Sequence, residues 1–181
     1  MLARSTLLAL GLCFASCAAP ASPDGMTVGE REYSKLLTQD VELQRLPVMR
    51  VREVTGGLET SSMGTPQIAS MDFARALRSS LLYLELSPPR NETALDLDAQ
   101  LLELELPSGA LDMPAYLTVR YRLFREEDEL IYDHTIRTGY LIPRETSFAG
   151  VERARLAIEG AARDNIFELV LSLWKDLNTA P

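Results

Sequence analysis

Hydrophobic positions at helical spacing mark two segments of the chain. Between residues 71 and 85, an apolar side chain recurs at intervals of four and three, as one face of a helix packed on a core requires. Ser70 is placed to cap this helix, and the pair Pro88 and Pro89 ends it. The positions on its apolar face are Phe73, Leu77, Leu81 and Leu84.

The second helical segment covers residues 150–177, which is long for a globular domain, and we expect an interruption near Gly160. Its stripe consists of Val151, Ala154, Ile158, Ala161, Asn165, Leu169 and Leu173. Because Asn165 stands on this apolar stripe, we expect it to hydrogen-bond a strand end and not a ligand. A further group either covers the core or faces a binding partner, and both interpretations stay open: Phe167, Leu171 and Trp174.

Alternation at period two predicts strands between these helices and before them. A first strand ends at the turn formed by Gly56 and Gly57. In the next strand, residues 94–106, the alternation slips by one residue after Leu101, which is typical of a β-bulge. Two more strands follow, over residues 115–125 and 130–140, with these inward positions: Leu117, Val119, Tyr121 and Leu123, then Leu130, Tyr132, His134 and Ile136.

The element order is strand, helix, three strands and helix. Short connections between the last three strands predict an antiparallel meander. Residues 31–45 fit either a short helix or an irregular segment. The predicted fold class is therefore α+β, a two-layer domain with a mainly antiparallel sheet and two helices packed on one face.

The N-terminal segment predicts export. Residues 1–16 carry one cation, Arg4, and a short apolar core, as a secretory signal does. This core is far shorter than the roughly 20 apolar residues of a membrane-spanning helix. The stretch that ends in Ser16 and Cys17 resembles the lipobox of bacterial lipoproteins, with Phe14 where Leu is usual. That resemblance implies cleavage between Ser16 and Cys17 and lipidation of Cys17; the alternative is a secreted soluble protein with an incidental Cys.

Lipidation would set the location of the protein. Acyl chains such as palmitate on Cys17 give stable membrane anchoring when two or more are present. In lipoproteins of this type an Asp after the Cys retains the protein in the inner membrane, and Ala18 stands there instead. The resemblance therefore implies the cell outer membrane, facing the periplasm. Residues 17–30 are rich in Pro and Gly and predict a flexible tether, followed by a single periplasmic domain over residues 31–181.

Composition excludes several kinds of chemistry. With Cys13 removed in the signal and Cys17 lipidated, no thiol remains for a disulfide, a zinc site or a nucleophile. The net charge of −8 has the wrong sign for a nucleic-acid partner. We expect no cofactor.

Titratable residues suggest no defined site. His134 is the only His, and a hydrolytic triad would need Ser and acid partners that sequence alone does not place. Four carboxylates alternate along the second strand and could gather Ca²⁺, although strand spacing favours a solvated face offset by Arg120 and Arg122. These are Asp96, Asp98, Glu103 and Glu105. We assign no catalytic residue and no metal ligand, and expect no enzyme activity.

Three segments of the chain are distinctive in combination: "VTGGLETSS", "LDLDAQLLELE" and "GVERARLAIEGAARDNIFELVLSL". Together, over about residues 48–173, they resemble a family of small alphaproteobacterial lipoproteins of uncharacterised function. Some family members carry the name UDP-N-acetylglucosamine acyltransferase. That activity belongs to a left-handed β-helix of hexapeptide repeats, which this chain lacks. In architecture the domain is also similar to periplasmic lipoproteins that assist lipopolysaccharide assembly or ABC-type lipid transport.

The expected function is a membrane-anchored, non-enzymatic accessory or binding component of the cell envelope, with an envelope protein as partner. The alternative is a lipid-binding carrier or chaperone, which would need an apolar cavity. An envelope hydrolase is the third hypothesis and would need polar partners around His134.

Overall fold

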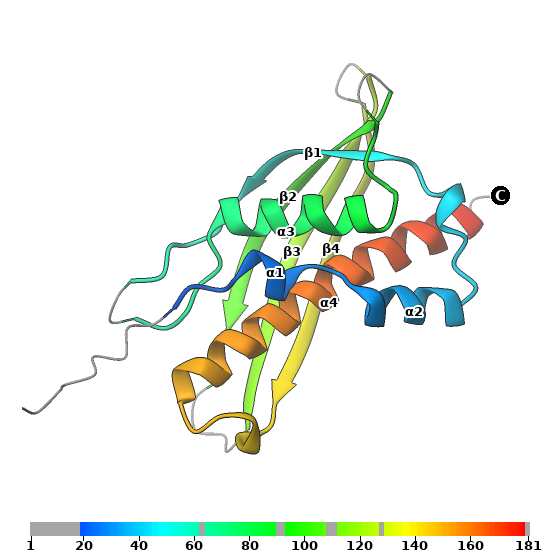
Figure 1. Cartoon of the computed structure of the whole chain (residues 1–181). Helices are drawn as coiled ribbons and strands as arrows, with labels where there is room; N and C mark the ends of the chain where they lie inside the picture. The colour runs from blue at the N-terminus through cyan, green and yellow to red at the C-terminus, as the bar shows by residue number, and fades with distance from the viewer. Residues whose placement is uncertain (1–18, 62–63, 90–92, 108–111, 127–128, 180–181) are drawn as a thin grey trace, which may run out of the picture.

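The computed structural model describes residues 19–61, 64–89, 93–107, 112–126 and 129–179 (Figure 1). The strands are β1 (Met49–Thr55), β2 (Leu95–Glu105), β3 (Met113–Phe124) and β4 (Leu130–Ile142). The helices are α1 (Pro23–Met26), α2 (Glu30–Thr38), α3 (Ser70–Tyr83) and α4 (Gly150–Thr179), with the short 3₁₀ turns η1 (Leu43–Arg45) and η3 (Arg144–Thr146).

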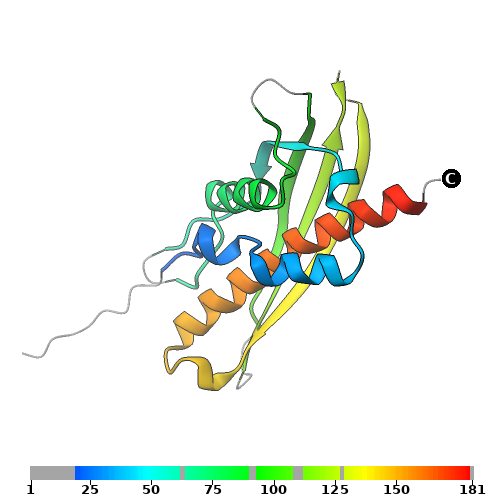
Figure 2. The same ribbon diagram turned by 45° about the vertical axis from the view of Figure 1, so that its right-hand side comes forward.

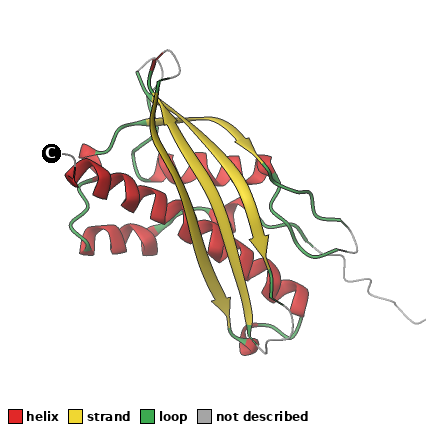
Figure 3. Cartoon of the chain, turned by 180° about the vertical axis from the view of Figure 1, so that it is seen from behind, coloured by secondary structure: helices red, strands yellow, loops and turns green. Residues whose placement is uncertain are grey.

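The four strands form one sheet in the order β1-β2-β3-β4. β1 pairs in parallel with β2, and β2, β3 and β4 pair antiparallel, so the predicted meander is confirmed. A parallel pair needs a crossover, and α3 provides it. All four helices lie on one side of the sheet, as the view from behind shows (Figures 2 and 3). The α+β class with a mainly antiparallel sheet is confirmed, with four helices on the covered face where two were expected.

The predicted bulge in β2 is present. The register against β3 shifts between Leu101 and Glu103, at the position where the sequence changes phase. A second shift, against β2, lies between Val51 and Glu53 of β1. As a result Val54, and not Glu53, packs against the core after the shift.

The start of α3 differs from the prediction. Ser70 is the first helical residue, and the capping position is Ala69, whose side chain makes no hydrogen bond. The Ser70 hydroxyl instead accepts a hydrogen bond from the backbone N–H of Gly57 at 2.9 Å. Ser70 therefore fastens the loop after β1 to the helix.

Helix α4 runs without interruption through Gly160, so the expected break is wrong. A Cβ atom at Gly160 would lie 2.3 Å from the ring of Tyr140 on β4. Glycine therefore serves close approach of the helix to the sheet. The predicted stripe is buried from Ala154 to Leu173, whereas Val151, in the first turn, is 38% exposed.

Residues 19–29 are folded, which corrects the expected flexible tether over most of its length. Ala21, Met26 and Val28 are buried in the core cluster. The N–H of Ser22 donates to Glu159 of α4 at 2.7 Å, and the N–H of Val28 donates to the Ser80 hydroxyl of α3 at 2.9 Å. The packed domain therefore begins within a few residues of Cys17, before the expected boundary at residue 31.

The core lies between the sheet and the helices. Inward residues of β3 are almost fully buried, as predicted: Leu117, Val119, Tyr121 and Leu123. They pack with α3 and α4 in one cluster that extends from Ala21 to Leu173. Among the described helices, none is long and apolar enough to cross a bilayer.

Candidate functional site

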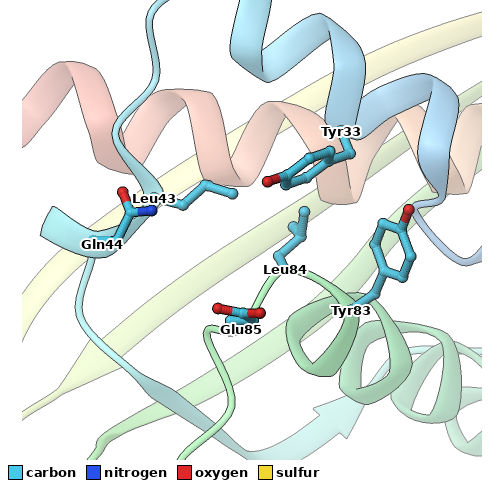
Figure 4. Close-up of a pocket in the computed structure, with 6 residues that line it drawn as sticks. All are labelled: Tyr33, Leu43, Gln44, Tyr83, Leu84 and Glu85. Carbon is cyan, nitrogen blue, oxygen red and sulfur yellow. The ribbon is translucent and has the colours of Figure 1, made fainter.

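A hollow of about 300 Å³ opens where α3 ends, next to α2 and η1 (Figure 4). Tyr33 of α2 and Tyr83 of α3 stand edge to face across it, with ring centroids 6.1 Å apart. Glu85 contributes a carboxylate. The remaining lining residues are Leu43, Gln44 and Leu84. Two aromatic rings beside a carboxylate suit an apolar or cationic group of a partner.

The local sequence explains why this hollow exists. Glu85 follows the end of α3 with a φ of 59°, in the left-handed region that costs energy for a non-glycine residue. This turn brings Leu86 back, so that its N–H donates to the Leu81 carbonyl at 2.8 Å and its side chain enters the core. The reversal leaves the carboxylate of Glu85 outside, at the rim.

A second hollow, of about 590 Å³, lies on the other side of the same helix end, between α3 and the edge strand β1. Its apolar lining residues are Met49, Val51, Leu81, Leu82, Pro88 and Pro89. Arg50 and Arg78 add two cations, and Arg78 donates to the Val51 carbonyl at 3.5 Å. The groove thus combines an apolar surface with positive charge.

Two exposed apolar side chains of α3 line these hollows, and a third lies on α2, one turn after Tyr33. Leu82 is 69% exposed and Tyr83 47% exposed, both on the last turn of α3, and Leu37 of α2 is 54% exposed. We call the two hollows with these three residues the α3-end surface. Sequence reasoning missed it, yet one signal was available, because Leu82 and Tyr83 lie off the buried stripe of α3. An apolar pair on the face that should be polar indicates a contact surface.

For three apolar residues of α4, the sequence leaves open whether they cover the core or face a partner. Phe167 and Leu171 are 6% and 4% exposed, so they belong to the core and present little surface to a partner. Trp174 is half-buried and packs against the same core, with the Arg45 guanidinium 5.4 Å from its ring centroid. A partner surface made of all three side chains is therefore not present.

Asn165 is fully buried and binds the middle of the sheet. Its Nδ2 donates to the carbonyls of Leu117 and Ile136 at 3.2 and 3.0 Å, and to the Thr138 hydroxyl at 3.0 Å. Its Oδ1 accepts a hydrogen bond from the Tyr121 hydroxyl at 2.8 Å. Asn165 thus binds strands, as expected, although at mid-strand positions instead of a strand end.

His134 lies on the rim of the sheet beside the end of α4. Its Nδ1 is 3.4 Å from the Ser172 hydroxyl and its Nε2 is 3.4 Å from Asp176. The ring stacks on Tyr132, whose hydroxyl donates to Ser172 at 3.0 Å. Burial raises the pKa of Tyr132 to about 12, which keeps that hydroxyl protonated as a donor.

The structure thus brings a Ser and an Asp to His134, which sequence could not do. Both distances exceed the range of about 2.6–3.2 Å typical of a nucleophile and its base. The His134 and Asp176 side chains are 48% and 45% exposed, and neither hollow at the end of α3 includes them. Their geometry fits an exposed polar contact between the two side chains.

Two of the β2 carboxylates, Asp98 and Glu105, pair with arginines. Asp98 accepts two hydrogen bonds from Arg52 of β1, at 2.9 and 2.8 Å, and lies 3.8 Å from Arg122. Glu105 pairs with Arg137 at 2.7 Å, whereas Arg120 pairs with Asp133 and not with β2. Across the described part of the chain, no three His, Cys, Asp or Glu side chains gather as metal ligands.

The residues expected to carry the lipid anchor lie outside the described residues. These are Ser16, Cys17 and Ala18, together with the signal over residues 1–16. Their roles stay predictions.

Comparison with known proteins identifies the fold. No family model matches the chain, and no curated protein matches it. Its structure is similar to that of protein XCC0632 from Xanthomonas campestris, of the DUF330 family, with a TM-score of 0.51 and 11% identity over 74% of this chain and 89% of that one. At this identity the likeness concerns the fold alone.

Two further solved structures match less closely. A minor lipoprotein from Acinetobacter baumannii has a TM-score of 0.45 and 14% identity, over 69% of this chain and 94% of that one. A candidate lipoprotein from Caulobacter crescentus has a TM-score of 0.44 and 14% identity, over 59% of this chain and 84% of that one.

Proposed function

We propose that the protein is a lipid-anchored, non-enzymatic accessory component of the bacterial envelope, which binds an envelope protein through the α3-end surface. The observation that carries this proposal is the exposure of Leu82 and Tyr83, which line the two hollows, together with the exposed Leu37 one helical turn after Tyr33. Exposed apolar groups of this kind mark contact sites in soluble domains. The resemblance to auxiliary lipoproteins of lipid transport suggests the type of assembly in which such a component serves.

The anchor is proposed at Cys17, with the domain in the periplasm on the outer membrane because Ala18 follows. This anchor is tested in cells that express the wild type or Cys17→Ala. The cells are labelled with an alkyne-tagged fatty acid, and their membranes are then fractionated. We expect label and outer-membrane residence in the wild type only. A wild type without label, found in the soluble fraction, would refute the anchor.

The binding surface is tested by complementation in a strain without the gene. Leu82→Glu places a charge where the wild-type side chain is exposed, so folding is preserved. We expect loss of the gene to make the envelope more permeable. We expect this variant to leave protein level and membrane residence unchanged and to fail to correct that permeability. Leu130→Glu, at a strand start that is similarly exposed, is the matched control and should restore the wild-type phenotype.

If Leu82→Glu complements as well as Leu130→Glu, the α3-end surface is not the site of action. A photo-crosslinking amino acid at Tyr83 gives a second measurement. The adduct should form at this position and not at Thr135, which is exposed on the uncovered face of the sheet.

The groove between α3 and β1 favours one alternative function, binding of an anionic lipid. Its volume of about 590 Å³ lies within the usual range for ligand sites, and Arg50 and Arg78 stand beside an apolar surface. Native mass spectrometry of the purified protein with phosphatidylglycerol would show a bound lipid that Arg50→Glu/Arg78→Glu loses. Absence of any bound lipid in the wild type would exclude this alternative.

A further inference from the structure

The starts of α3 and α4 define one side of the domain. β1, β2 and β4 run the same way, since β1 is parallel to β2 and β3 is antiparallel to both β2 and β4. Their ends lie at different levels, because Thr55 at the end of β1 is level with Gln100 and, through Arg120, with Thr135 in the middle of β4. α3 begins after β1 and α4 begins after β4, and Figures 1 and 2 show both helix starts on one side of the molecule.

The folded part of the chain also begins there. The N–H of Ala21 donates to the carbonyl of Gln67 at 3.3 Å, directly before α3. Figures 1 and 2 both show the first described residues on the same side as the starts of α3 and α4. We call this end of the molecule the anchor end.

Covalent geometry places the anchor end close to any lipid on Cys17. Cys17 and Ala21 are four positions apart in the chain, and four residue steps span at most about 14 Å. The buried Ala21 cannot move away from the domain without losing its packing. A lipid on Cys17 would thus hold this end, and no other, against the bilayer.

The anchor end carries apolar side chains that the core does not use. Leu58 follows β1 and is 64% exposed, and Met71, in the first turn of α3, is 65% exposed. Phe148, just before α4, is 109% exposed, and Val151 in the first turn of α4 is 38% exposed. In water each of these side chains is unfavourable, and lipid would bury them.

We infer that Leu58, Met71, Phe148 and Val151 enter the headgroup region of the membrane and fix the orientation of the domain on it. The inference rests on the proposed lipid anchor. The net charge of −8 gives no general attraction to an anionic lipid surface, so the contact is apolar and local. The lipid anchor keeps these side chains at the bilayer, and their insertion stops the domain from turning about its attachment.

Tryptophan fluorescence in vesicles tests the orientation. The lipidated full chain is purified from membranes and reconstituted into phosphatidylethanolamine and phosphatidylglycerol vesicles with brominated acyl chains, which quench nearby indoles. The test protein carries Phe148→Trp with Trp174→Phe, and the control carries Leu130→Trp with Trp174→Phe. Phe148 and Leu130 are both exposed and lie toward opposite ends of the strands, so neither change disturbs the core.

The wild type supplies a further reporter. Trp174 lies 24 residues after the start of α4, which corresponds to about 36 Å along the helix. We expect brominated lipid to quench and blue-shift the indole introduced by Phe148→Trp, and to leave both Trp174 and the Leu130→Trp control unchanged. Adding Met71→Ser and Leu58→Ser should reduce the quenching.

The outcomes distinguish a failure of the membrane contact from a failure of the proposed lipid anchor. If the protein floats with the vesicles and the indole at position 148 is not quenched, the anchor stands and the membrane contact is refuted. Equal quenching at positions 148 and 130 would also refute a fixed orientation. If the protein isolated from membranes carries no lipid and does not float, the proposed anchor is wrong and the inference fails with it.

Discussion

Asn165 offers the sharpest test of how the helical layer is joined to the sheet. Its side chain is fully buried and makes four hydrogen bonds, three as a donor and one as the acceptor for Tyr121. Asn165→Leu keeps similar volume and removes all four. The Tyr121 hydroxyl, fully buried, is then left without its acceptor, which costs about 1–3 kcal/mol. The lost donor to two strand carbonyls adds about 1 kcal/mol.

We therefore expect Asn165→Leu to lower the free energy of unfolding by about 3 kcal/mol. For a domain of this size that lowers Tm by about 6–12 °C. Urea unfolding, followed by circular dichroism on the Cys17→Ala protein, measures it. Tyr121→Phe alone should lower the free energy of unfolding by about 1 kcal/mol. In the double variant no unsatisfied hydroxyl remains. Its loss of stability should therefore be smaller than the sum of the two single losses, by about 1 kcal/mol or more.

Two results would refute this reasoning. Asn165→Leu with a stability within about 0.5 kcal/mol of wild type would mean that packing, and not hydrogen bonding, joins α4 to the strands. Strictly additive effects of Tyr121→Phe and Asn165→Leu would mean that the hydroxyl and the amide do not act as a pair.

Three further predictions concern α4. Gly160→Ala should destabilise the domain by about 1–3 kcal/mol in urea unfolding, despite the helix preference of Ala, because its Cβ meets the Tyr140 ring; a more stable variant would contradict the close packing. Burial raises the pKa of Asp164, so folding disfavours the ionised form of this side chain. Asp164→Asn should therefore be more stable than wild type at pH 7. The two proteins should be equally stable at pH 3, where Asp164 is protonated in both the folded and the unfolded protein. Glu159→Ala removes the acceptor of the Ser22 N–H and should make residues 19–29 sensitive to protease while α4 resists; unchanged protection would show that apolar packing alone holds this segment.

The parts of the fold that could be predicted depend on local pattern. Side-chain alternation identified the inward residues of β3, and the change of phase after Leu101 located the bulge, because a strand has period two whatever it packs against. Asn165 was recognised as a structural residue since a polar group on an apolar stripe must find buried partners. These inferences need only neighbours in sequence.

The parts that could not be predicted depend on contacts between distant segments. Residues 19–29 have the composition of a linker, yet Ser22 bonds to Glu159, 137 positions away. The continuity of α4 at Gly160 depends on Tyr140 of another element. Likewise Tyr33 and Tyr83 form a site only because the first turn of α2 lies beside the last turn of α3, and the partners of His134 come from α4.

The two ends of the molecule carry different apolar surfaces, and α3 connects them. Met71 lies in its first turn at the anchor end, and Leu82 and Tyr83 lie in its last turn, at the α3-end surface. A helix of 14 residues is about 21 Å long. If the proposed lipid on Cys17 holds the first end at the membrane, a helix perpendicular to the bilayer would place the second about 20 Å above its surface. A rigid domain on a short attachment presents its binding surface at a set height, whereas a long tether would let that surface search the periplasm. The folding of residues 19–29 therefore favours a partner that is itself fixed relative to the membrane, such as a subunit of an envelope assembly, over a freely diffusing one.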